Sequence, residues 1–382
     1  MEKIFKFITK EYEGVNQAAL LLGSLTLLSQ ILALFRDRFI AHFIGPGAEL
    51  DVYYAAFRVP DLIFICIASL ASITVIIPFL IARMEGDKAT KQAQKYLNDI
   101  FTVFLYLMIF VSVLVFILMP YLVKFIAPGF NTVLQIKLIS VSRIMLLSPI
   151  LLGLSNLFGT VTQLFRKFFV YSLSPVFYNI GIIAGVIFLY PFWGIYGLAC
   201  GVVFGAFMHF SIQALSSSVC GFMPTISLSV DFKEIKKVAL ISLPRTLGLA
   251  FNNLSLIYII SLASFLKGGS ISVFNFAFNL QSVPLNIIGI SYAVAAFPTL
   301  AKSFGSGKKD EFIGHLKEAA RAIVFWSIPV IFLFVVLRAQ IVRVILGSSN
   351  FSWDNTRLVA ACLAILHYFL VPTMQQETLR GL

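Results

Sequence analysis

The sequence predicts an all-α, polytopic membrane protein with about ten transmembrane helices, and three observations lead to this fold class. First, 59% of the 382 residues are hydrophobic and only 12% are charged, whereas a soluble protein carries about 25% charged residues. Second, apolar segments recur with the roughly 20 residues that a helix needs to cross a hydrocarbon core. Third, features of the second apolar segment return near residue 284, which predicts two similarly built lobes.

Ten segments have the length and apolarity of a membrane span. They cover residues 16–44, 52–82, 99–127, 133–159, 168–190, 193–215, 236–261, 270–300, 311–337 and 355–380. The N-terminal segment and every second loop together hold 17 Lys and Arg residues, against 8 on the opposite side. The positive-inside rule therefore predicts that the N-terminus lies in the cytoplasm, and ten spans return the C-terminus there.

Several function classes are disfavoured by the sequence. The net charge of +12 does not indicate nucleic-acid binding, because the basic residues lie in short loops between apolar segments. The four cysteines and four histidines have no metal-binding or redox spacing, and no set of residues has the spacing of a catalytic centre. The segment 304–309 (FGSGKK) is not a phosphate loop, because Lys302 stands where the first glycine is needed. We therefore expect no enzyme, no metal and no cofactor, and transport driven by an ion gradient or the membrane potential.

The first two spans carry charges that a membrane helix does not tolerate without a reason. Arg36 and Asp37 precede a Gly-Pro-Gly turn that begins at Gly45, and Asp51 and Arg58 follow it. A charge at the centre of a membrane helix costs about 2.5–3.5 kcal/mol even on the lenient insertion scale, so such residues normally face a protein interior or a wet cavity. The hairpin predicts a functional cavity. The alternative is a structural salt bridge, such as one between Arg36 and Asp51.

An internal repeat organises the rest of the chain. Val59-Pro60, Pro78-Phe79-Leu80 and Ser148-Pro149 are echoed 224, 220 and 223 residues later, at Val283-Pro284, Pro298-Thr299-Leu300 and Val371-Pro372. The repeat predicts a first lobe at residues 1–218 with six spans and a second lobe at residues 219–382 with four. A second lobe that is two helices short predicts a fragment of a longer protein, with a partner that supplies the pair as the alternative. Gly45, Pro60, Pro175 and Pro284 are the expected hinge or structural positions.

The second lobe offers one arginine and several amides as candidate site residues. Arg245 lies early in the seventh span, where snorkelling to the interface is the alternative interpretation. Asn275, Asn279 and Asn286 share one helical face, and interhelical hydrogen bonding is the usual role of such a stripe. A cavity lined by arginines and amides would suit a sugar-phosphate head group, because the forked donors of arginine match phosphate oxygens.

The ordered motifs resemble the MurJ/MviN family of lipid II flippases, in the MOP superfamily. The resemblance covers essentially the whole chain and rests on residues 34–38 (LFRDR), 43–51 (FIGPGAELD), 55–60 (AAFRVP), 127–130 (APGF), 174–179 (SPVFYN), 243–248 (LPRTLG), 268–275 (GGSISVFN), 281–284 (QSVP) and 297–300 (FPTL). It implies a bundle of two six-helix lobes around a central cavity, in a bacterial plasma membrane. The resemblance also implies about fourteen helices in all, so the last four are absent here.

The resemblance also implies site residues. Arg36, Asp37, Asp51 and Arg58 match cavity positions of the family. Other positions depart from the pattern of the family: Gln30 stands where a second arginine is usual, Phe64 and Ile65 replace basic residues, Ser69 and Leu70 replace an acidic residue and a glycine, and Phe278-Asn279 replaces an Asp-Arg pair. We hypothesise that Arg245 supplies the positive charge missing at Asn279.

Three functions fit these features. The first is a flippase that moves an undecaprenyl-pyrophosphate-linked peptidoglycan precursor to the outer leaflet, with the pyrophosphate among Arg36, Arg58 and Arg245 and the lipid tail in the bilayer. The second is another exporter of the superfamily, for a polysaccharide lipid or for drugs. The third is a non-transporting membrane scaffold that recruits cell-wall synthesis proteins through its cytoplasmic loops.

Overall fold

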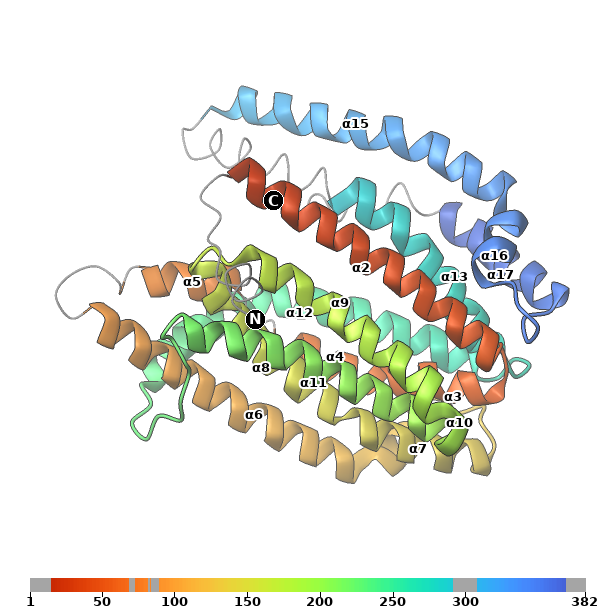
Figure 1. The fold of residues 1–382 in the computed structure, drawn as a ribbon, viewed down its shortest axis with the longest axis horizontal. Coiled ribbons are helices and arrows are strands. Elements are labelled where there is room, and N and C mark those ends of the chain that lie inside the picture. Colours follow the sequence, from red (N-terminus) through yellow and green to blue (C-terminus); the bar gives the residue numbers. More distant parts are fainter. Residues whose placement is uncertain (1–14, 69–72, 82, 84–88, 291–307, 369–382) are drawn as a thin grey trace. The chain divides into compact units, whose positions relative to one another are not determined.

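The computed structural model describes residues 15–68, 73–81, 83, 89–290 and 308–368 (Figure 1). Apart from one isolated β-bridge between Ser348 and Phe351, all regular structure in these ranges is helical. The predicted all-α class is confirmed. The helices of the N-terminal half are α2 (Val15–Phe43), α3 (Ala48–Ala56), α4 (Arg58–Ala68), α5 (Ile73–Ile81), α6 (Ala89–Ile126), α7 (Thr132–Met145), α8 (Leu147–Leu164), α9 (Phe168–Ala184), α10 (Tyr190–Trp193) and α11 (Ile195–Val219). The remaining helices are α12 (Phe232–Ala263), α13 (Ser270–Pro284), α15 (Lys309–Val336), α16 (Arg338–Leu346) and α17 (Trp353–Tyr368), and π-helical segments η1 (Gly185–Leu189) and η2 (Leu285–Ile290) follow α9 and α13.

Eight segments of the described chain are long and apolar enough to cross a membrane. They correspond in order to eight of the ten predicted spans, from Leu20–Phe43 to Asp310–Val336. The other two predicted spans, 52–82 and 355–380, each contain residues outside the described ranges. Of the repeat motifs, Pro298-Thr299-Leu300 and Val371-Pro372 also lie outside the described residues.

The chain divides into two compact units. The first comprises residues up to Leu32 together with Ala48–Ile271, and the second comprises Ala33–Gly47 together with the residues from Ser272 onward. Helix α2 contributes to both. The predicted lobes at residues 1–218 and 219–382 were defined by the internal repeat. A division into compact units does not test that repeat, so the two lobes stay a prediction.

The first unit is built around α8, α9 and α11, which pack side by side (Figure 1). A close backbone approach joins Gly181 and Gly185 to Gly201 and Gly205. A Cβ atom added to Gly201 would lie 2.6 Å from the Cα atom of Gly185, so only glycine allows the two backbones to come this close. Small residues four apart are the usual device for close helix packing in membranes, and here they fix the position of the helix that carries Pro175.

Both helices that carry the repeated Val-Pro motif depart from regular α geometry beside it. Helix α3 ends at Ala56 and α4 begins at Arg58, so Pro60 lies in the first turn of α4, where its missing N–H group costs nothing. Pro284 ends α13 and is followed by the π-helical segment η2. Proline removes a helical hydrogen bond and π segments are frequent at functional sites. The break between α3 and α4 precedes Pro60, whereas η2 follows Pro284, so the two interruptions lie on opposite sides of the repeated motif.

Replacing Gly201 with leucine is expected to lower the free energy of unfolding by about 3 kcal/mol, the upper end of the range for an overpacked core. Gly248→Leu is the matched control, because a Cβ atom at Gly248 meets no atom within 4 Å. Thermal unfolding of the detergent-solubilised protein measures both. Equal melting temperatures for the two variants would show that the glycine contact between α9 and α11 does not determine stability.

Candidate functional site

The predicted charged residues Arg36 and Asp37 form a network with Asn279 in the second unit. The Nε and Nη2 atoms of Arg36 donate to Oδ1 of Asp37 at 3.0 and 2.8 Å. The other carboxylate oxygen, Oδ2, accepts a hydrogen bond from Nδ2 of Asn279 at 2.9 Å. The Asp37 side chain is 4% exposed and the Arg36 side chain 20%. A carboxylate between a cation and an amide therefore holds the Arg36 guanidinium in place.

This network accounts for a charge pair inside an apolar helix. A buried ion pair offsets its desolvation only when additional hydrogen bonds satisfy the remaining lone pairs, and Asn279 supplies that bond. Asn279 belongs to the predicted amide stripe, and its bond to Asp37 joins α13 to α2 as the interhelical role of such a stripe predicts.

The end of α2 is anchored so that this network keeps its position. The Nη1 atom of Arg38 donates to the carbonyl oxygens of Val344 and Ile345 at 2.7 and 3.0 Å, in the last turn of α16. In the other direction, Nδ2 of Asn350 donates to the carbonyl of His42 at 2.7 Å. Terminal carbonyls of a helix have no partner within the helix. Arg38 therefore satisfies the end of α16, and Asn350, in the segment that follows α16, satisfies the end of α2.

Gly45, a predicted hinge or structural position, has a steric reason to be glycine. Its φ of 72° lies in the left-handed region, and a Cβ atom there would collide with the backbone carbonyl of Asn350. Its role as a hinge stays a prediction.

Asp51 lies in the first unit and binds the backbone of the turn that precedes α13. Its side chain is buried, and its Oδ2 atom accepts a hydrogen bond from the N–H of Gly269 at 2.6 Å. Gly269 has a φ of 100°, and the neighbouring Gly268 packs against Ala48 of α3. Asp51 therefore has a structural task in connecting α3 to this turn.

The other predicted arginines also belong to the first unit. Arg58 is half-buried on α4, one turn from Asp61, with which it interacts electrostatically. Helix α12, which carries the exposed Arg245, packs against α4. The expected pocket among Arg36, Arg58 and Arg245 would combine residues of both units, and it stays a prediction.

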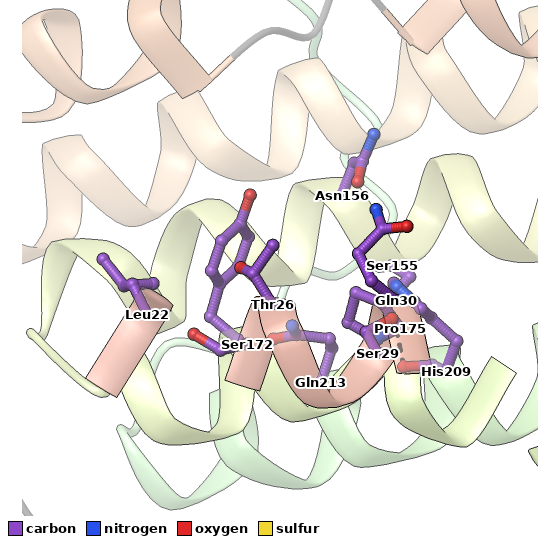
Figure 2. Close-up of a pocket in the computed structure, with 11 residues that line it drawn as sticks. Leu22, Thr26, Ser29, Gln30, Ser155, Asn156, Ser172, Pro175, His209 and Gln213 are labelled. Carbon is purple, nitrogen blue, oxygen red and sulfur yellow. Dashed lines mark hydrogen bonds between the residues drawn. The ribbon is translucent and has the colours of Figure 1, made fainter. Parts of the chain in front are cut away.

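The first unit contains a polar cavity that sequence analysis missed. It has a volume of about 390 Å³ and lies among α2, α8, α9 and α11 (Figure 2). Gln30, Asn156 and His209 line it, together with the predicted hinge residue Pro175. Uncharged polar residues on four separate helices have no common spacing, so no pattern indicated that they meet.

Comparison with solved structures gives the class of this fold. A multidrug resistance MATE family transporter of the MOP superfamily, in an inward-facing conformation, superposes with a TM-score of 0.72 at 17% identity, covering 95% of this chain and 84% of that one. A structure of the lipid II flippase MurJ in an inward closed conformation has a TM-score of 0.80 at 22% identity, covering 95% of this chain and 75% of that one. The fold is that of a MOP-superfamily transporter.

Sequence comparison gives the family. The family model described as lipid II flippase MurJ matches residues 40–380, so this chain belongs to that family, and the predicted resemblance is confirmed. The protein named "Probable lipid II flippase MurJ" in Rhizobium tropici is 25% identical over 366 residues, which cover 90% of this chain and 66% of that protein. The chain thus spans about two thirds of the length of this relative.

Replacing Asn279 with leucine leaves Oδ2 of Asp37 without its donor and is expected to cost about 1–3 kcal/mol of unfolding free energy. Asn252→Leu, at an exposed position of α12, is the control. In an Asp37→Leu background the cost of Asn279→Leu should disappear, because the acceptor is gone. A double-mutant cycle by thermal unfolding measures this coupling, and additive effects would refute the link.

Asp51→Ala is expected to destabilise the protein by about 1–3 kcal/mol, because the N–H of Gly269 loses its buried acceptor. Asp51→Asn keeps an acceptor oxygen in the same place and should retain most of the stability. Comparing the two melting temperatures separates this hydrogen bond from a requirement for negative charge. Equal losses in both variants would assign the role of Asp51 to its charge.

Proposed function

We propose that this chain forms part of a flippase that moves lipid II, the undecaprenyl-pyrophosphate-linked peptidoglycan precursor, from the cytoplasmic to the outer leaflet by alternating access. The observation that carries the proposal is the Arg36–Asp37–Asn279 network, found in a chain of the lipid II flippase MurJ family. A guanidinium held in one orientation inside a membrane protein is suited to a diphosphate, which accepts paired hydrogen bonds from its forked donors.

In this proposal the network has a role both before and after the substrate binds. Without substrate, Asp37 offsets the cost of the partly buried Arg36 charge. When a diphosphate enters, Arg36 contributes donors from a side chain that is already ordered, so little conformational entropy is lost on binding. Arg58 and Arg245 would complete the diphosphate site, with Arg245 supplying the charge that Asn279 does not. The lipid tail stays in the bilayer while the head group crosses.

The proposal also includes the membrane, the energy source and the partners of this activity. The protein lies in the plasma membrane of a bacterium, with its N-terminus in the cytoplasm, and the membrane potential or an ion gradient supplies the energy without a cofactor. Its partners are the lipid-linked glycan and the surrounding membrane lipid, and cell-wall synthesis proteins are the proposed protein partners. Nucleic acid has no place in this function.

Drug export is the less suitable activity for this site. The structural likeness to MATE transporters concerns the fold alone, since the identity is 17%. A cationic drug needs a carboxylate to bind, and the buried Asp37 carboxylate already receives Arg36 and Asn279 on its two oxygens. A lipid diphosphate instead matches the cation that the network presents.

Complementation of a bacterium depleted of its own lipid II flippase tests the function, using the complete protein that carries this sequence. We expect growth with the unaltered protein and its loss with Arg36→Ala. Removing a charge-assisted hydrogen bond costs about 1.5–3 kcal/mol, which is about 10- to 150-fold in diphosphate affinity. Arg245→Ala should reduce growth as well, and Arg357→Ala, at an exposed position of α17, should not.

Normal membrane expression without complementation would contradict the proposed activity and favour a scaffold that does not transport. Complementation by Arg36→Ala would leave the activity standing and remove Arg36 from the substrate site. Full complementation by Arg245→Ala would refute the compensation assigned to that residue.

A further inference from the structure

The polar cavity of the first unit is large enough for a ligand rather than an ion. Its volume is about 390 Å³, within the range of about 300–1,000 Å³ typical of small-molecule sites. A water molecule occupies about 30 Å³ of liquid. The space therefore accommodates a group of many heavy atoms, and a single metal ion or chloride would leave most of it unfilled.

The walls of this cavity are polar but carry no fixed charge. Among the described residues that line it there is no Asp, Glu, Lys or Arg; the polar members include Thr26, Gln30, Asn156, Tyr171 and His209. Placing an ion in a protein interior without a countercharge is costly. Hydroxyl and amide groups instead favour an uncharged ligand that both donates and accepts hydrogen bonds. The lining thus selects against the diphosphate itself.

Part of the wall is held rigid by hydrogen bonds that lining residues make to one another and to a residue behind them. The hydroxyl of Ser155 lies 2.7 Å from Nδ1 of His209, which joins α8 to α11. The Nε2 atom of Gln213 donates to the hydroxyl of Ser174 at 2.8 Å, which joins α11 to α9. These bonds fix three of the four helices around the cavity, so its shape exists before any ligand enters.

Two amides in the wall are available to a ligand. Within the described part of the chain, the side-chain amides of Gln30 and Asn156 have no hydrogen-bond partner, and Figure 2 shows both at the same end of the cavity. Each amide offers two donors and one acceptor oxygen. Tyr171 and Pro175 also line the cavity and add apolar surface to it. Amides in a cavity that also contains an aromatic ring suit a pyranose, whose hydroxyl and acetamido groups alternate with C–H faces.

We propose that this cavity binds the uncharged sugar of the lipid-linked glycan, through Gln30 and Asn156; the inference rests on the proposed flippase function. It gives the departure at position 30 a physical meaning. The resemblance to the family predicts an arginine at this position, and with the amide in its place the described lining contains no cation. The diphosphate and the sugar are then recognised by separate groups of side chains.

Binding measurements on the solubilised protein test this inference with two probes. One is a short-chain polyprenyl diphosphate that bears an N-acetylated disaccharide, and the other is the same diphosphate without sugar. We expect the unaltered protein to bind the sugar-bearing probe more tightly. The double variant Gln30→Leu/Asn156→Leu should lose at least about 10-fold in affinity for that probe, from two lost hydrogen bonds, and nothing for the bare diphosphate.

Two further variants serve as a control outside the cavity and as a milder change within it. Gln340→Leu, at an exposed position of α16, should bind both probes like the unaltered protein. Thr26→Val preserves the shape of a lining residue and should lower affinity only for the sugar-bearing probe. If the double variant does not fold, the Thr26→Val variant takes its place in the test.

The outcomes separate the inference from the function on which it rests. Equal affinity of the unaltered protein for the two probes, or an unchanged preference in the double and Thr26→Val variants, would overturn the sugar site and leave the flippase function intact. Failure to bind either probe would overturn both. A preference that is lost only when the cavity is altered would establish the site.

Discussion

Asp37 is the residue on which the site depends, because a carboxylate buried in an apolar helix needs a partner on each oxygen. Arg36 and Asn279 supply those partners. The consequence reaches beyond the three side chains: Asn279 lies on α13, so the charge on α2 sets the register between two helices that are more than 200 residues apart in sequence. Arg38 and Asn350 extend the same constraint by joining the end of α2 to the segment around α16.

Helix α2 carries two kinds of chemistry in the two compact units to which it contributes. Residues from Ala33 onward group with the second unit and include the charged pair, while Gln30 belongs to the first unit and lines an uncharged cavity. On α2, the charged residue Arg36 and the neutral polar residue Gln30 are thus six positions apart. A substrate with a charged diphosphate and a neutral glycan carries the same two chemistries in its own covalent structure.

Features whose signals are local could be predicted from the sequence, and those that depend on distant contacts could not. Eight spans were recognised because apolarity over about 20 residues is a property of the segment itself. Arg36 and Asp37 were recognised because charge in an apolar helix is costly. The partner of Asp37 was not, since Asn279 was one of several amides on its face. The cavity around Gln30 was missed for the same reason: serine, threonine and amides are tolerated in membrane helices, and only the fold shows which of them meet.

The two amides Gln30 and Asn279 change the way in which this chain would recognise its substrate. The resemblance predicts a cation at both positions, and in the proposed function each amide has a role of its own. Asn279 donates to Asp37, whereas an arginine there would compete with Arg36 for the same carboxylate. Arg36 and Asp37 together are electrically neutral, so their attraction for a diphosphate depends on the direction of the guanidinium donors more than on net charge. Directional hydrogen bonds are therefore the main source of selectivity in the proposed site, and the surrounding structure has to hold those donors still.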